Sequence, residues 1–149
     1  MIRLTGLVTI ERDGAAPRHL SSAQAQVAFA RLALERAGGT SRDQLADTVW
    51  PEGLPDTWAS ALRSVVSRVR GFVVGNDIEA SPPIVAQGGR YLLRLPVGAI
   101  VDVEQAEAEV AQATEAFANG EYADAERLAS SAVSCLERPF LPDHEGEWV

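Results

Sequence analysis

Alternating apolar and polar residues open the chain. Ile2-Arg3-Leu4 and the run 7–12 alternate as half-buried strands do, and a turn signal at 13–14 precedes the run 18–20. We therefore expect a small antiparallel sheet at the start of the fold.

Helical patterns replace the alternation after residue 20. Ser21 with Gln24 predicts a capping box for a helix that runs to about Ala37 and ends at a pair of glycines. Ser41 with Gln44 predicts a second capping box. The helix that follows this box is short, because a proline forbids its continuation after residue 50.

A third helix is expected over residues 58–72, after the loop 51–56, with Asp56 or Thr57 as its N-cap. At about 100° per residue its apolar residues fall on one side and its polar residues on the other. The apolar side holds Trp58, Leu62, Val65, Val66, Val69 and Phe72. The polar side holds Ser60, Arg63, Ser67 and Arg70, with Ser64 and Arg68 at its edge.

Two strand-like runs come next, 84–86 and 91–95, on either side of a glycine pair. They predict a β-hairpin. Three helices followed by a hairpin, with arginines on the third helix, is the element order of a winged helix-turn-helix.

The last third of the chain predicts two more helices. Asp102 with Gln105 predicts a third capping box, and apolar residues then recur at spacings of three and four up to Phe117. Asn119-Gly120 breaks this pattern, and a second helix is expected from about Tyr122 to Leu136. We expect an antiparallel helical hairpin, followed by an irregular acidic tail over 140–149.

Charge divides the chain of 149 residues at the same place. The net charge is −8, but residues 1–96 carry 11 arginines against nine acidic residues, and residues 97–149 carry two arginines against twelve. This split indicates two segments with different partners.

Several classes of function find no support in the composition. One cysteine and two histidines exclude a disulfide framework and favour neither a metal site nor a cofactor site. No combination of nucleophile, base and oxyanion donor indicates an enzyme. The start of the chain is too polar for a signal peptide, and no apolar run is long enough to span a membrane, so we expect a cytoplasmic protein.

The run 58–72 contains no acidic residue, although the protein as a whole is acidic. Arginines and small hydroxyls without a neighbouring carboxylate suit a helix that enters the major groove of DNA. A solvated face whose charges keep the chain soluble explains the same residues equally well. These residues alone leave both interpretations open.

Three motifs together resemble the OmpR-type winged-helix domain of the Streptomyces antibiotic regulatory protein family. They are SRDQLADTVW (41–50), ALRSVVSRVR (61–70) and GRYLL (89–93). The segment from 101 onward resembles the start of the bacterial transcriptional activation domain of that family, and ATEAFANGEYADA (113–125) is similar to the turn of a tetratricopeptide repeat. The resemblance implies an α+β fold with a winged-helix DNA-binding domain over 1–96 and a partial helical domain over 97–149.

The resemblance also assigns roles to residues. It implies Arg63 and Ser67 as readers of base edges, with Ser64 and Ser60 on the same DNA-facing side of the helix. Arg68 and Arg70 would contact phosphates, and Arg90 would contact DNA from the wing. Ser41 and Arg42 would clamp a phosphate at a helix N-terminus. In the second half, Phe117 and Tyr122 are expected to fill the elbow of the helical hairpin.

The function that follows is a sequence-specific regulator of transcription that binds double-stranded DNA. By resemblance it would be an activator that binds direct repeats as a homodimer and contacts RNA polymerase through the loop 51–56. The alternative is a protein-interaction module in which the winged helix no longer binds DNA and the acidic hairpin docks a partner.

Overall fold

The computed structural model describes residues 1–75, 82–142 and 144–149, and the chain folds into two compact units. One unit holds the described residues of 18–97 together with 144–149, and the other holds Met1–Pro17 and Gly98–Pro142. The mixture of helices and short antiparallel strands confirms the expected α+β class.

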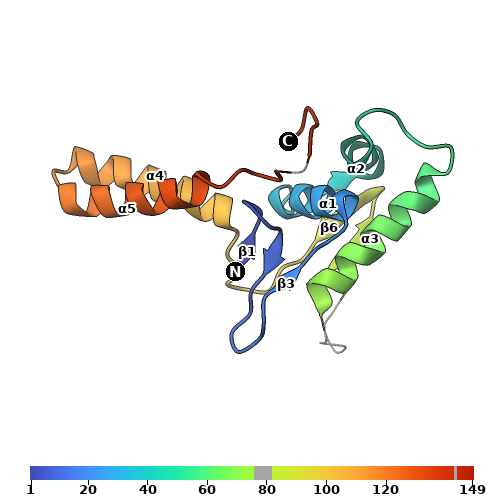
Figure 1. The fold of residues 1–149 in the computed structure, drawn as a ribbon, viewed down its shortest axis with the longest axis horizontal. Coiled ribbons are helices and arrows are strands. Elements are labelled where there is room, and N and C mark those ends of the chain that lie inside the picture. Colours follow the sequence, from blue (N-terminus) through green and yellow to red (C-terminus); the bar gives the residue numbers. More distant parts are fainter. Residues whose placement is uncertain (76–81, 143) are drawn as a thin grey trace. The chain divides into compact units, whose positions relative to one another are not determined.

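The first of these units is built around α1 (Ala23–Leu34), which packs against α2 (Arg42–Val49) and α3 (Trp58–Val74) (Figure 1). Phe29 of α1 meets Phe72 of α3 edge to face, with ring centroids 5.2 Å apart. The side chains that α3 buries are Leu62, Val65, Val66, Val69, Phe72 and Val73. Because this apolar side is used for the core, the arginine and serine side of α3 is left facing solvent.

α1 ends three residues earlier than the sequence predicts. The amides of Gly38 and Gly39 turn back to the carbonyl of Glu35, which closes the helix after Leu34. β4 (Thr40–Ser41) follows directly after these glycines.

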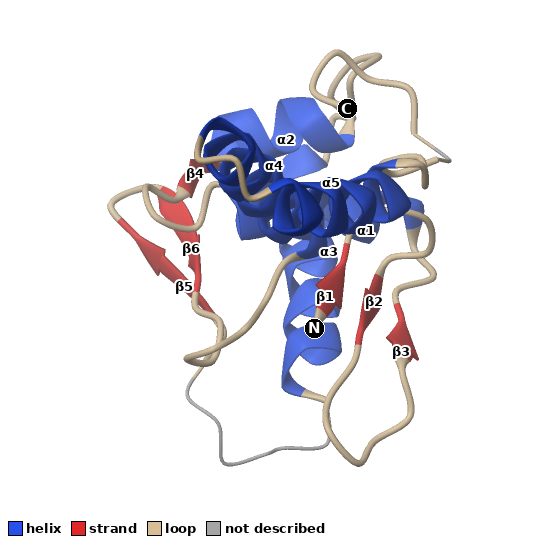
Figure 2. Cartoon of the chain, turned by 90° about the vertical axis from the view of Figure 1, so that its left-hand side faces the viewer, coloured by secondary structure: helices blue, strands red, loops and turns tan. Residues whose placement is uncertain are grey.

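The predicted hairpin is present as β5 (Ile84–Gln87) and β6 (Arg90–Leu93). Its turn is Gly88-Gly89, and both glycines have positive φ, as a two-residue hairpin turn of this kind requires. β4 pairs antiparallel with the other edge of β6, so that β6 lies between β4 and β5 (Figure 2). The sequence did not indicate β4, because two residues are too few to show an alternation.

One of the three predicted capping boxes forms. Ser41 accepts a hydrogen bond from the amide of Gln44, and the Gln44 side chain accepts one from the amide of Ser41. The box predicted at Ser21 is wrong, because α1 begins at Ala23 with Ser22 as its N-cap, and no side chain caps it.

The box predicted at Asp102 is also wrong, because this carboxylate is used elsewhere. α4 (Asp102–Ala118) begins after Val101, and the Asp102 side chain is buried. It accepts hydrogen bonds from the amides of Leu4 and Thr5, at 2.9 and 3.1 Å, and from the Thr5 hydroxyl at 2.6 Å. The carboxylate therefore fastens the start of the chain to the helical hairpin.

The hairpin itself is confirmed. α4 and α5 (Tyr122–Leu136) run side by side, joined by a turn at Asn119-Gly120 where Gly120 has a positive φ (Figure 1). Within the same unit β1 (Ile2–Arg3) pairs antiparallel with β2 (Thr9–Ile10). The short β3 (Arg18–His19) belongs to the other unit, which contains α1, α2 and α3.

The two units differ from the domain boundaries 1–96 and 97–149 expected from sequence. The first 17 residues join the helical unit, because Ile2 bridges Val101 and Thr5 bridges Phe140 in addition to the hydrogen bonds of Asp102. The described part of the tail, 144–149, joins the other unit, where His144 contacts the side chain of Gln26 and Trp148 lies over the guanidinium of Arg31.

The elbow of the hairpin is not filled as predicted. Phe117 and Tyr122 contact each other edge to face, with ring centroids 5.4 Å apart, but their side chains are 66% and 64% exposed. α4 and α5 instead pack through small residues, and the buried ones are Ala106, Ala113, Ala116, Ala125 and Ala132. Alanines allow the two helices to approach so closely that the rings are left outside the contact.

Candidate nucleic-acid interface

The solvent-facing side of α3 carries the residues that the sequence singled out. Ser60, Arg63, Ser64, Ser67 and Arg68 are all exposed, and α3 contains no acidic residue. Arg63 makes no hydrogen bond or ion pair with any residue that the structure describes. Its five N–H donors are therefore available to an external acceptor.

The serines of this face differ in which of their hydrogen-bonding groups remain unused. Ser60 donates its hydroxyl proton to the carbonyl of Thr57, and Ser64 donates to the carbonyl of Ser60. Ser67 makes no such bond within the described part of the chain. Ser67 thus keeps both its donor and its acceptor, and it lies one helical turn from Arg63.

The other two arginines of α3 are partly engaged. Arg68 reaches the hydroxyl of Ser22 at 3.5 Å, and Arg70 donates to the carbonyl of Ile84 at 3.3 Å. Arg70 therefore links α3 to β5 of the wing. Both side chains remain exposed, so each guanidinium keeps donors free for a phosphate.

Sequence reasoning missed Arg18, which holds the end of α3. Its guanidinium donates to the carbonyls of Phe72 and Gly71 and lies 5.9 Å from the centre of the Phe72 ring. These carbonyls belong to the last turn of the helix, where a cation is favoured by the helix dipole. No local pattern connects a residue at 18 with a helix that ends at 74, so only the fold reveals this contact.

The residues predicted at the α2 N-terminus and at the wing come together in space. β4 places Ser41 directly opposite Arg90, and the amide of Arg42 donates to the carbonyl of Gly89 in the wing turn. Arg90 donates in turn to the carbonyl of Gly39 at 2.8 Å. Two segments about fifty residues apart in the sequence therefore form one polar surface.

Arg42 is the least satisfied member of this surface. Its Nε is buried and has no hydrogen-bond partner among the described residues, and its guanidinium lies 5.9 Å from the centre of the Trp58 ring. Trp58, which the sequence assigned to the core, is half-buried at the start of α3 and supports Arg42. The aromatic ring holds the cation at the N-terminus of α2, where the helix dipole favours an anion.

Among the described residues, neither a metal site nor a membrane-spanning helix accompanies this surface. Within the ranges 1–75, 82–142 and 144–149, no group of three or more histidine, cysteine or acidic side chains is placed to hold a metal. The helices of these ranges are all too short or too polar to cross a bilayer.

The elements described above define a winged helix-turn-helix protein, because α2 and α3 are followed by the β5–β6 wing and the polar side of α3 is free. A solved structure of Mycobacterium tuberculosis EmbR in complex with a low affinity phosphopeptide is similar to this chain, with a TM-score of 0.80 and 26% sequence identity. The match covers 95% of this chain and 37% of the EmbR chain. No protein-family model and no curated protein matches the sequence.

The likeness to EmbR confirms the resemblance to the Streptomyces antibiotic regulatory protein family that the motifs indicated. The chain has the fold of these transcriptional regulators. It spans little more than a third of the length of EmbR.

Proposed function

We propose that the protein is a sequence-specific regulator of transcription that binds double-stranded DNA through α3 and the wing. The observation that carries the proposal is the acid-free, exposed side of α3, on which Arg63 and Ser67 have unused hydrogen-bonding groups in a protein of net charge −8. A face that only kept the chain soluble would not need to exclude carboxylates.

In this proposal α3 enters the major groove. Arg63 has the fork of donors that matches the O6 and N7 acceptors of guanine, and Ser67 reaches the adjacent base edge. The hydroxyls of Ser60 and Ser64 already donate hydrogen bonds to backbone carbonyls, so these side chains offer DNA only acceptors. Both side chains are small enough to allow a close approach of the helix. Arg68 and Arg70 contact phosphates on either side of the groove.

The surface formed by the α2 N-terminus and the wing serves as the phosphate clamp. Ser41, Arg42 and Arg90 lie together there, so we propose that they bind the backbone as one unit rather than at two separate places. Wing residues in such domains lie along the minor groove next to the site of the recognition helix, which is consistent with Arg90 at the wing turn.

Activation is the finer part of the proposal and rests on the family resemblance. The loop between α2 and α3 exposes Leu54 between Glu52 and Asp56, and we propose that this loop contacts RNA polymerase. Homodimers on directly repeated sites, the cytoplasm as location and the absence of an enzymatic activity are proposed on the same ground. The winged-helix role is proposed for residues 1–96 and a docking role for 97–149.

A titration of the intact protein with DNA at several salt concentrations tests the proposal. We expect a binding site to be selected from a random duplex library. Four arginine contacts to phosphates predict that log affinity falls with log salt with a slope of about −3 to −4. Two repeats one helical turn apart should bind two protomers. Failure to bind any duplex at low salt would refute the proposal and leave the alternative, an interaction module without DNA binding.

A further inference from the structure

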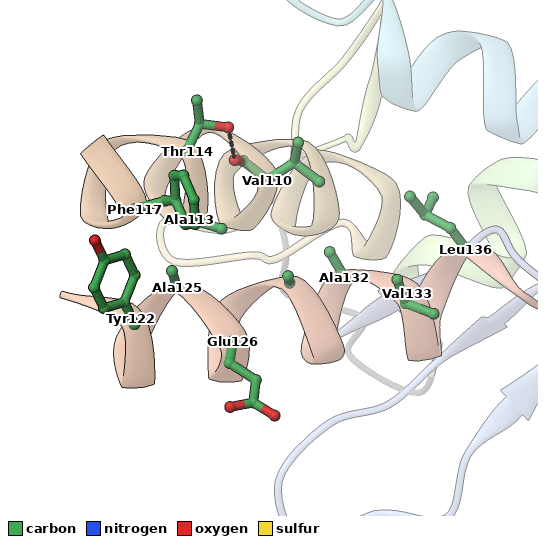
Figure 3. A pocket seen from close by; sticks show the side chains of 11 residues that line it. Val110, Ala113, Thr114, Phe117, Tyr122, Ala125, Glu126, Ala132, Val133 and Leu136 are labelled. Carbon is green, nitrogen blue, oxygen red and sulfur yellow. Dashed lines mark hydrogen bonds between the residues drawn. The ribbon is translucent and has the colours of Figure 1, made fainter. Parts of the chain in front are cut away.

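An apolar groove runs along the helical hairpin on the side where α4 and α5 leave their larger side chains uncovered (Figure 3). Its volume is about 560 Å³. Phe117 and Tyr122 stand at the end next to the hairpin turn, and Leu136 lies at the other end of α5. Between them the groove is lined chiefly by Val110, Ala113, Ala129 and Val133.

The groove is more than scattered surface hydrophobicity. Val110, Phe117, Tyr122, Val133 and Leu136 are each about half exposed or more, and all five line this one groove. Single exposed apolar side chains are ordinary, but a contiguous patch marks a binding surface. The alanine contacts already hold α4 against α5, so these larger side chains are not needed for the hairpin itself.

Charge indicates what kind of molecule covers the groove. Glu126 lines the groove. Glu107 and Glu137 flank it: Glu107 precedes Val110 by three residues on the same side of α4, and Glu137, the C-cap of α5, follows Val133 by four residues. All three carboxylates are exposed. Arg127 directly follows Glu126, which places it about 100° further around α5 and away from the groove, and it pairs with Asp124 at 3.2 Å. The rim is therefore negative.

A negative rim disfavours two possible occupants. A second copy of this chain would bring the same carboxylates against the rim, and like charges at close range are unfavourable. A membrane surface with anionic lipids would be repelled for the same reason. A cationic partner would instead be attracted by the carboxylates of the rim.

We propose that the groove binds an amphipathic helix of a partner protein, with apolar residues at spacings of three and four and lysine or arginine on both flanks. Helices dock into grooves in this way by inserting one apolar stripe. α5 has 15 residues, and at about 1.5 Å per residue the groove accommodates a helix of similar length. This proposal rests on the docking role proposed for residues 97–149 and names its partner. The interaction involves no DNA, so a failure of peptide binding is distinguishable from a failure of DNA binding.

Two synthetic peptides of 15 residues test the charge and the fit together. Both carry leucine at the stripe positions, and one has lysine on the flanks where the other has glutamate. We expect isothermal titration of the intact protein to show binding of the lysine peptide and at least tenfold weaker binding of the glutamate peptide. Equal affinity for both peptides would overturn the proposal.

Three variants locate the site. Val133→Asp is expected to weaken the lysine peptide at least tenfold, and Glu126→Lys two- to fivefold. Glu115→Lys is the matched control, because Glu115 is exposed on α4 and does not line the groove. Its added positive charge acts on the peptide only from a distance, so Glu115→Lys should weaken the lysine peptide less than Glu126→Lys does. Glu126→Lys alters an exposed side chain, so the test holds even if Val133→Asp perturbs folding. Equal effects of Glu115→Lys and Glu126→Lys would overturn the proposal.

The alternative occupants are tested with the same proteins. In sedimentation experiments the protein should not self-associate through the groove, so Val133→Asp should leave its oligomeric state unchanged. Vesicles that contain an anionic lipid should not bind the protein. Either of these results, if positive, would assign the groove to a second copy or to a lipid surface and overturn the proposal.

Discussion

In the proposed function, single residues on α3 decide whether DNA is recognised by its sequence or bound through its phosphates alone. Arg63 is unpartnered and exposed, whereas Arg70, assigned from sequence to a phosphate, also donates to the carbonyl of Ile84. Removal of Arg70 would therefore disturb the wing together with any phosphate contact. Arg68 is the better representative of a phosphate-binding arginine, because its contact with Ser22 is long and exposed.

The substitution Arg63→Ala is expected to cost about 1 to 3 kcal/mol of binding to the selected site and to relax preference at one base position. Arg68→Ala should instead weaken selected and random DNA alike. Fluorescence anisotropy with both duplexes gives the two ratios. Equal losses on the two duplexes for both variants would remove Arg63 from base reading.

The capping box of α2 permits a matched test of a single hydrogen bond. Ser41→Ala removes the side chain that accepts from the amide of Gln44, and we expect the free energy of unfolding to fall by about 1 kcal/mol. Ser22→Ala is the control, because the N-cap of α1 makes no side-chain cap and its loss should cost about 0.5 kcal/mol or less. Urea unfolding measures both. Equal costs would contradict the role assigned to the box.

At the scale of elements, the β4 strand decides how the α2 N-terminus meets the wing. Gly39 precedes β4 with φ of +68°, and a Cβ at this position would lie 3.0 Å from the carbonyl oxygen of Tyr91 and 3.0 Å from Cγ of Leu92. A side chain there would strain the backbone and press on β6.

Gly39→Ala is therefore expected to lower the free energy of unfolding by about 1 to 3 kcal/mol and to weaken DNA binding through the displaced Ser41, Arg42 and Arg90. Gly38→Ala is the neighbouring control, because a Cβ at residue 38 meets nothing within 4 Å. Thermal unfolding and anisotropy compare the two variants. A tolerated Gly39→Ala would show that β4 is not held as described.

For the helical hairpin we expect a small loss of stability, because the Phe117 ring lies outside the contact between α4 and α5. Phe117→Ala should cost about 1 kcal/mol or less, because the ring is mostly exposed and its main partner is Tyr122. Leu62→Ala in the buried core of the other unit should cost about 2 to 5 kcal/mol. Denaturant unfolding monitored by circular dichroism compares them. A loss of several kcal/mol for Phe117→Ala would show that the elbow is filled after all.

For the whole molecule, the distribution of charge opposes the proposed function. Residues 97–149 carry two arginines against twelve acidic residues, which repels DNA wherever they lie within about a Debye length, near 8 Å at physiological salt. Deletion of the acidic segment is a poor test of this repulsion. It would remove Asp102 and Val101, which hold the first residues of the chain.

Neutralising exposed carboxylates tests the same repulsion without removing the residues that hold the start of the chain. Replacement of Glu107, Glu115, Glu126 and Glu137 by glutamine raises the net charge by four, and we expect affinity for random DNA to rise at low salt and the gain to shrink at high salt. The selected site should gain no more than random DNA, because base contacts do not depend on this field. Unchanged affinity at low salt would show that the acidic segment lies farther from bound DNA than the field reaches.

The sequence by itself determined the features that local periodicity encodes. The apolar and polar sides of α3, the capping box at Ser41, the Gly88-Gly89 hairpin and the two helices after residue 101 all follow from residues within one or two turns of each other. Such patterns act through the backbone of a single segment, so they can be read without knowing what the segment packs against.

Only the tertiary structure decided which segments meet. The pairing of β4 with β6 places Ser41 opposite Arg90. Asp102 accepts hydrogen bonds from Leu4 and Thr5 as well as from the amide of Val103 in its own helix. Phe117 lies outside the helix contact because alanines form that contact. Each of these outcomes depends on competition between partners distant in sequence, and a polar or aromatic side chain shows its preference only when the fold presents the alternatives.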